Sequence, residues 1–270
     1  MFKRHVSIAF VAIFASFGFL TPTHAQDQGD LFVTARYWYA LSGDHRFNST
    51  GSSIDSSEMV PVGLGGASIT YVPKNMGGTS FSFTGFYGTG DGDHREAGPL
   101  AGTFNGTIHY QRLDLEGLVQ NPIAGTGATW GYGLRYVDLK VGANGFDSGA
   151  PPSPFQFQEN IKLYLAELGF GLSAPVEPSG KFRLFANFNG VAGFRDQKHS
   201  DAYMGVTNNS SKSGGVVGVD TNAGIAWQFN PAMTFSARYR LFVLSDVDFN
   251  FQRETDIIHG PEANLTVKLN

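Results

Sequence analysis

The chain has 270 residues, of which 19 are basic and 23 acidic, so its formal net charge is −4. This balance argues against nucleic acid as a partner, because binding to a phosphate backbone relies on an excess of Lys and Arg. The chain has no cysteine, which excludes stabilisation by disulfides. Its 35 glycines and 24 phenylalanines, within an ordinary hydrophobic content of 41%, indicate β structure rather than disorder, because disordered chains are poor in aromatic residues.

The N-terminus has the pattern of a secretory signal peptide. A basic start with Lys3 and Arg4 precedes an apolar run over residues 6–20, and small residues precede a cleavage site after Ala25. The alternative is a retained membrane anchor, but a run of about 15 residues is short for a spanning helix, which needs about 20. We therefore predict that residues 1–25 are cleaved, which leaves 17 basic against 23 acidic residues and a net charge of −6.

Ten segments of the remaining chain have the character of β-strands. Most are long enough to cross a bilayer at a tilt, which takes about 9–11 residues. The predicted strands are residues 31–41, 60–72, 79–87, 104–119, 128–140, 161–173, 181–194, 215–229, 233–244 and 260–269. No segment of helical period intrudes and no linker divides the chain, so we predict that residues 26–270 form a single all-β barrel domain.

The connections between these strands alternate in length and chemistry. Long, polar connections are predicted at residues 42–59, 88–103, 141–160, 195–214 and 245–259. Short connections, each of which contains proline, are predicted at residues 73–78, 120–127, 174–180 and 230–232. Short turns on one side and long loops on the other are typical of barrels that cross an outer membrane, with both chain ends on the short-turn, periplasmic side.

Residues 215–229 indicate which solvent surrounds the barrel. Alternate residues from Val217 to Phe229 are mainly apolar, whereas those between them, such as Asp220 and Asn222, are small or polar. Because a strand alternates its side chains between two faces, one face of this strand is apolar and ends in aromatics. The pattern predicts lipid on the apolar side.

In its architecture, the chain after residue 25 resembles the bacterial outer-membrane β-barrel proteins. A tripeptide of a small or apolar residue, Arg and Tyr recurs on three predicted strands, as Ala35-Arg36-Tyr37, Leu134-Arg135-Tyr136 and Ala237-Arg238-Tyr239. Members of this class usually finish on an aromatic residue that the assembly machinery reads, whereas this chain ends in Leu269-Asn270. The resemblance implies a closed, antiparallel, up-and-down transmembrane barrel in the outer membrane. The implied partners are outer-membrane lipid, lipopolysaccharide and the barrel-assembly machinery.

Assigning faces strand by strand separates an apolar outer surface from a charged inner one. The predicted lipid-facing residues are Val33, Tyr37, Tyr39, Phe81, Phe83, Tyr87, Leu113, Leu115, Trp130, Tyr132, Leu134, Tyr136, Tyr164, Leu168, Phe170, Phe182, Leu184, Phe188, Phe194, the alternate residues from Val217 to Phe229, Phe235, Tyr239, Leu241, Leu265, Val267 and Leu269. The predicted lumen-facing charged cluster is Arg36, Arg112, Asp114, Glu116, Arg135, Glu167, Arg183, Asp220, Arg238, Arg240, Glu262 and Lys268. A charge turned to lipid costs roughly 2–4 kcal/mol at the bilayer midplane, so twelve charges on one consistent face indicate that this face looks inward.

Two features of the interior follow from the same patterns. The second strand changes parity between its start and its end, because Val60 and Leu64 do not share a face with Ile69, and we therefore expect a bulge near Gly65-Gly66. Barrels of eight strands can be filled by side chains, whereas those of 16–18 strands leave a water channel. With ten strands, the lumen is either a polar core that makes the barrel rigid or a small pore with a weakly cationic constriction.

We find no enzyme signature and predict no catalytic, cofactor-binding or metal-binding residues. Ten-stranded barrel proteases use acidic pairs near a histidine at the outer rim, and lipid-cleaving barrels place His and Ser two apart on one strand face. The acid, histidine and serine candidates here are adjacent pairs that would point apart on a strand: Asp44-His45, Asp93-His94 and His199-Ser200. His109 is followed two positions later by Gln111 rather than Ser. Asp91 and Asp93 with Glu96 lack the spacing of a calcium loop, which has a glutamate at its twelfth position.

The sequence leaves two principal functions open. The first is a structural membrane element or a narrow passive diffusion pore. The second is a surface adhesin or receptor that binds an unidentified ligand with its long loops, which contain the aromatic residues Phe155, Phe157, Tyr203, Phe249 and Phe251. An enzyme at the rim has little support, and a soluble exported barrel would have to bury charges beside no apolar core or leave its aromatic face in water.

Overall fold

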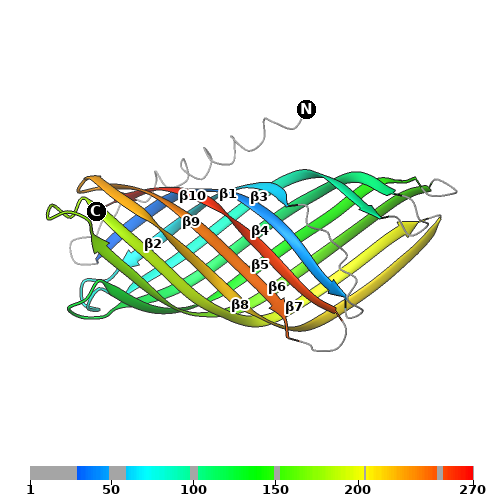
Figure 1. Cartoon of the computed structure of the whole chain (residues 1–270). Helices are drawn as coiled ribbons and strands as arrows, with labels where there is room; N and C mark the ends of the chain where they lie inside the picture. The colour runs from blue at the N-terminus through cyan, green and yellow to red at the C-terminus, as the bar shows by residue number, and fades with distance from the viewer. Residues whose placement is uncertain are drawn as a thin grey trace.

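The computed structural model describes residues 29–48, 59–97, 103–148, 153–203, 205–247 and 252–269. These residues form a closed barrel of ten antiparallel strands, each paired with its neighbours in the chain, and β1 closes the barrel against β10 (Figure 1). The strands are β1 (Asp30–Asn48), β2 (Val60–Val72), β3 (Ser80–Ala97), β4 (Thr103–Pro122), β5 (Ala128–Asp147), β6 (Ser153–Pro175), β7 (Phe182–Tyr203), β8 (Val206–Asn230), β9 (Met233–Asp246) and β10 (Gln252–Lys268). All ten predicted strands are confirmed. No helix in these residue ranges is long and apolar enough to cross a bilayer. The predicted signal at residues 1–25 lies outside the described residues.

The strands are strongly staggered around the barrel. Val33 of β1 has a directly paired residue on β2, that residue has one on β3, and so on around the barrel. When these pairs are traced through β10 back to β1, they end at His45, so the sheet closes with an offset of twelve residues. Such a stagger requires the strands to tilt against the barrel axis, as Figure 1 shows. A ten-stranded barrel lies near the size whose interior side chains can fill, so the inward residues decide whether the lumen is open.

The strands begin and end close to the predicted short turns, but they run much further on the opposite side. The predicted long connection at 195–214 is wrong, because β7 continues to Tyr203 and β8 begins at Val206. Polar residues here pair through their backbones, as Ala202 does with Thr207, and backbone pairing does not require an apolar face. Gly205 supplies the positive φ of the intervening turn. The barrel wall therefore extends well past the aromatic belt on this side.

The outward face carries the predicted lipid-facing side chains. Leu134 and Phe194 are the most exposed of the large hydrophobic residues there, at 72% and 71%. Aromatic rings pair along this face near the short turns, where Phe182 stacks on Trp227 with 5.9 Å between ring centroids. An apolar surface bordered by aromatic rings is the exterior that a bilayer stabilises.

The bulge expected in the second strand is absent. The pairing of β2 with β1 and with β3 runs without a shift through Gly65 and Gly66. Val62 and Leu64 are fully buried in the lumen, whereas Tyr71, at the other end of the strand, faces outward and is exposed. The parity of the apolar residues changes along β2 because the lumen itself is apolar at this end.

Candidate functional site in the barrel lumen

A layer of ion pairs crosses the middle of the lumen, and Glu262 of β10 anchors one side of it. Its carboxylate accepts a hydrogen bond from Arg36 Nε at 2.9 Å, and both of its oxygens accept from Arg238 Nη2 at 2.7 and 2.8 Å. Arg36 also donates to the hydroxyl of Thr84 at 3.2 Å. These contacts join β10 to its neighbours β1 and β9 and, through Arg36, to β3. We call the whole set of charges at this level the ionic layer.

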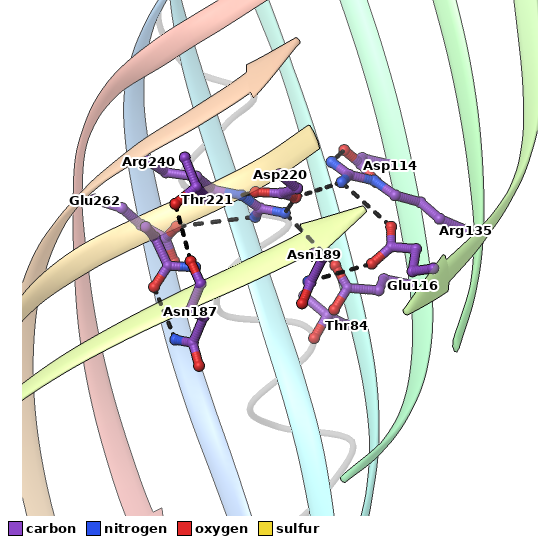
Figure 2. Close-up of polar contacts among 12 residues, drawn as sticks. Thr84, Asp114, Glu116, Arg135, Asn187, Asn189, Asp220, Thr221, Arg240 and Glu262 are labelled. Atoms are coloured by element: carbon purple, nitrogen blue, oxygen red, sulfur yellow. Dashed lines mark hydrogen bonds and ion pairs between the residues drawn. The ribbon is translucent and has the colours of Figure 1, made fainter. Parts of the chain in front are cut away.

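The other side of the ionic layer connects strands that are not neighbours in the sheet. Asp220 of β8 accepts from Arg240 Nε at 3.0 Å and from Arg135 Nη1, on β5, at 2.6 Å. Arg135 also binds Asp114 of β4 through two hydrogen bonds of 2.7 and 2.5 Å. Figure 2 shows these side chains pointing toward one another across the interior. The Asp220–Arg135 contact therefore bridges strands that are three positions apart, and the 3.5 Å ion pair between Arg240 of β9 and Glu116 of β4 joins opposite walls of the barrel.

The charges of the ionic layer compensate one another. It contains five arginines and five carboxylates, namely Arg36, Arg112, Arg135, Arg238 and Arg240 with Asp114, Glu116, Glu167, Asp220 and Glu262. The formal charge of the layer is therefore zero. Removing one partner of a buried ion pair strands the other and costs about 3–5 kcal/mol, so the layer holds the lumen in one arrangement.

Two members of the predicted cluster lie apart from this layer. Arg183 is exposed near the short-turn mouth and donates to the Ser173 hydroxyl at 3.0 Å. Lys268 pairs with Asp30 at 2.8 Å, and both side chains are partly exposed. The other ten predicted residues come together, and the lumen-facing amides Asn187, Asn189 and Asn222 lie beside them.

An apolar layer lies on the ionic layer, toward the side with the long strand extensions. All ten strands contribute to it, and its buried residues are Trp38, Ala40, Val60, Val62, Leu64, Phe86, Tyr110, Val137, Leu139, Ile161, Leu163, Leu165, Val191, Val216, Phe242, Leu244 and Ile258. Aromatic rings join the two layers. The guanidinium carbon of Arg135 lies 4.2 Å from the centre of the Phe242 ring, and that of Arg240 lies 5.0 Å from the Trp38 ring. Such contacts contribute about 2 kcal/mol when they are desolvated.

A polar chamber of about 310 Å³ lies on the other side of the ionic layer, toward the short turns. Most of its wall is made of short hydroxyl and amide side chains, namely Thr34, Ser68, Thr70, Ser82, Thr84, Asn187, Asn189, Asn222, Ser236, Asn264 and Thr266. Glycines on β6 give these side chains room. A Cβ at Gly169 would lie 1.8 Å from the Asn189 side-chain oxygen, and one at Gly171 would lie 2.5 Å from that of Asn187. Small residues therefore keep this part of the lumen open.

A second group of charges, of which Arg195 and Asp246 are buried, lies beyond the apolar layer, and sequence reasoning missed it. Arg195 of β7 pairs with Asp246 at 3.2 Å and with Asp256, while Lys212 pairs with Asp246 at 3.0 Å. These residues fall in segments predicted to be loops, where no face was assigned. Continuing the inward parity of β7 from Asn189 would have placed Arg195 in the lumen.

The candidate catalytic and metal-binding residues are dispersed. Asp91 and His109 face outward and form an exposed pair at 2.7 Å. His199 lies 3.6 Å from the Glu159 carboxylate and stacks against Phe157. No group of three or more His, Asp or Glu residues that could hold a metal ion occurs among the described residues. The side chains of the predicted candidates Asp44, His45, His94 and Glu96 lie outside the described set, as do the rings of the rim aromatics Phe155, Tyr203, Phe249 and Phe251.

Comparison with solved structures identifies the architecture. No protein-family model and no curated protein matches the chain. The outer-membrane protease OmpT from Escherichia coli is similar over 89% of this chain and 97% of its own, with a TM-score of 0.54 and 11% identity. The translocator domain of the autotransporter NalP from Neisseria meningitidis is similar over 97% of this chain and 95% of its own, with a TM-score of 0.52 and 11% identity.

The chain has the fold of the bacterial outer-membrane β-barrels. One of these two structures is a protease and the other a translocator domain, so the structural similarity supports the fold but indicates no particular activity for this chain. The function of this barrel has to be argued from its own lumen and surface.

Proposed function

We propose that this chain is an integral outer-membrane barrel that conducts no solute and serves as a structural element of the membrane. The observation that carries the proposal is the packing of side chains across the lumen at two levels. Side chains from all ten strands fill it at the apolar layer, and a neutral set of ten charges fills it at the ionic layer. A narrow diffusion pore would need a continuous polar path through both layers.

The two layers oppose an ion for different physical reasons. An ion that enters the apolar layer loses its hydration without gaining a partner, and a hydrophobic constriction of this kind excludes water as well. In the ionic layer each arginine already has a carboxylate within 4 Å, and the layer has no net charge with which to attract an ion. The polar chamber therefore ends blindly against the ionic layer.

The exterior supports a location in the outer membrane. Phe83, Leu168 and Phe188 are among the large side chains that lie outward and are more than half exposed. In water this surface would be a very large apolar patch, whereas in a bilayer it is matched to its solvent. In this arrangement the short turns and the chamber face the periplasm, and the extended strands project outside the cell.

Planar-bilayer recordings on refolded protein test the proposed function. We expect no discrete conductance steps from a barrel whose far-ultraviolet circular dichroism shows the full β content. Reproducible single-channel steps from such a preparation would contradict a sealed lumen. Folding of the mature chain in buffer without detergent or lipid would contradict the membrane location separately.

A second candidate function, as a surface receptor or adhesin, is favoured by the β7–β8 extension. Residues 206–213 at the start of β8 are all exposed, so both faces of the strand are available beyond the barrel body. A barrel with residues 200–209 replaced by a two-residue turn tests this role. Loss of adhesion by cells that display the shortened but folded barrel would support it, and unchanged adhesion would argue against it.

A further inference from the structure

The polar chamber is large enough to hold a small molecule. Its volume of about 310 Å³ is the share that about ten water molecules occupy in the liquid. At the level of the chamber, the inward positions of two neighbouring strands are glycines, namely Gly131 and Gly133 of β5 and Gly169 and Gly171 of β6. Glycine weakens the interior of a strand, so this wall maintains the space at a cost in stability.

Polar groups on the β2 side of the chamber have no partner in the part of the chain that the structure describes. Ser68 is only 8% exposed and lines the chamber, but its hydroxyl makes no hydrogen bond with any described residue. The hydroxyl of Thr70, which also lines the chamber, likewise has no partner among those residues. Polar groups that leave water without gaining a partner are costly, so a molecule in the chamber that bonds to them is stabilised.

Two amides on the opposite side of the chamber have acceptors to spare. Asn187 of β7 donates to the Asn222 side chain at 2.9 Å. Asn189, on the same strand, donates to the Glu167 carboxylate at 3.5 Å. The Oδ1 oxygens of both amides accept no hydrogen bond from the residues that the structure describes. Because β2 and β7 are half a turn of the barrel apart, Ser68 and these oxygens face the chamber from opposite sides.

The charges at the chamber are already compensated. Five charged residues border it, and each lies within 4 Å of an opposite charge: Arg36, Glu116, Asp220, Arg238 and Arg240. An ionic ligand would have to compete with one of these pairs, whereas a neutral ligand leaves them intact. A hydroxyl group both donates and accepts, so a neutral molecule with several hydroxyls matches the mixture of free hydroxyls and amide oxygens.

We propose that the chamber binds a small neutral sugar, a monosaccharide or a disaccharide, which enters from the short-turn side. Its hydroxyls donate to the side-chain oxygens of Asn187 and Asn189 and exchange hydrogen bonds with Ser68 and Thr70. Phe185, which also lines the chamber, offers the C–H groups of the sugar ring a flat apolar surface whose face is weakly negative. The inference goes beyond the proposed structural role, and it requires neither an open lumen nor a bilayer.

The test is a saturation-transfer NMR titration of the refolded barrel in a phosphocholine detergent, because a detergent with a sugar headgroup would compete. The probes are glucose, galactose, mannose, N-acetylglucosamine and maltose, and we expect at least one to bind in the millimolar range or more tightly. The double variant Ser68→Val/Thr70→Val removes two hydroxyls and should weaken that binding about tenfold or more. Ser42→Val is the matched control, because Ser42 is an inward serine with the same 8% exposure at the far edge of the apolar layer, and it should bind as the unmodified barrel does.

Three results would overturn the proposal. The first is that none of the five sugars binds an unmodified barrel whose circular dichroism shows the full β content. The second is equal binding by the chamber variant and the Ser42→Val control, and the third is tighter binding of a phosphorylated glucose than of glucose itself. Single-channel conductance in planar bilayers would instead contradict the proposed structural function and would leave the sugar titration unaffected. The two failures are therefore distinguishable.

Discussion

The two halves of the lumen follow the same strand alternation but have opposite contents. On the short-turn side, inward positions hold mainly small or polar residues such as Ser68, Thr70 and Asn222, and a chamber of about 310 Å³ remains. On the other side, inward positions hold residues such as Trp38, Leu163 and Phe242, and these are almost completely buried. The ionic layer separates the halves. The comparison teaches that alternation determines which face looks inward, whereas side-chain volume determines whether the interior is open.

A substitution that disrupts the ionic layer, which separates the two halves, should lower the free energy of unfolding the most. Arg135→Met leaves the carboxylates of Asp114 and Asp220 without their shared partner, and we expect a loss of about 3–5 kcal/mol in the free energy of unfolding. Urea unfolding in detergent micelles measures it. Arg183→Met is the matched control, because Arg183 is exposed, and it should cost less than about 1 kcal/mol. Similar losses for both variants would show that the ionic layer does not hold the lumen together.

A matched pair of phenylalanines compares the two halves directly. Phe242 is fully buried in the apolar layer, whereas Phe185 lines the chamber. Phe242→Ala should cost about 3–5 kcal/mol, because it leaves a cavity in a packed region and removes the ring beside Arg135. Phe185→Ala only enlarges an existing cavity and should cost about half as much or less. The same unfolding measurement applies, and a larger loss for Phe185→Ala would reverse our assignment of the packed half.

Substitutions on the two faces of β8 test which face is turned to lipid and which to the lumen. Val219→Arg places a charge against lipid and should cost roughly 2–4 kcal/mol, with a strong loss of barrel assembled in membranes. Asn222→Arg places the same charge beside the polar chamber, where there is room for it. Quantifying folded barrel in outer-membrane fractions distinguishes the two variants. Equal tolerance of both would mean that the faces are reversed.

The smallest expected difference in stability is between two substitutions on β2, a strand that contributes inward residues to both halves of the lumen. Val62→Ser introduces a hydroxyl into the apolar layer and should cost about 1–3 kcal/mol. Ser68→Val changes a residue of the chamber wall and should change stability by less than about 1 kcal/mol. Thermal unfolding of the two refolded variants provides the comparison, and equal shifts would indicate that the two levels are equally packed.

The sequence predicts the strands and their outward face well because lipid leaves a strong pattern. Proline and glycine in the short turns locate one end of each strand, and β2 was predicted with the bounds that the structure shows. The other ends were missed, because strands such as β7 and β8 continue through polar residues that pair only by their backbones. The alternation of apolar and polar residues stops where the strands leave the membrane, but the strands themselves continue beyond it.

The content of the lumen was predictable only in part. The residues of the ionic layer could be recognised, because each charged residue alternates along its strand with the apolar residues of the lipid-facing side. The apolar layer could not, because residues such as Val62 and Leu64 look the same whether lipid or other side chains surround them. The bulge predicted for β2 was wrong for this reason. The contact between Arg135 and Asp220 also depends on closure of the barrel, which no local pattern contains.

The most direct test of the central claim uses the absence of cysteine from the chain, since an introduced thiol is then the only one. Ser68→Cys and Val62→Cys place a thiol on inward positions of the same strand, in the chamber and in the apolar layer respectively. The measurement is the rate of labelling of the folded barrel by a charged, membrane-impermeant maleimide. Our account predicts rapid labelling at position 68 and labelling at position 62 only after unfolding. Equal labelling of both positions in the folded protein would show that water passes through the lumen and would contradict the account.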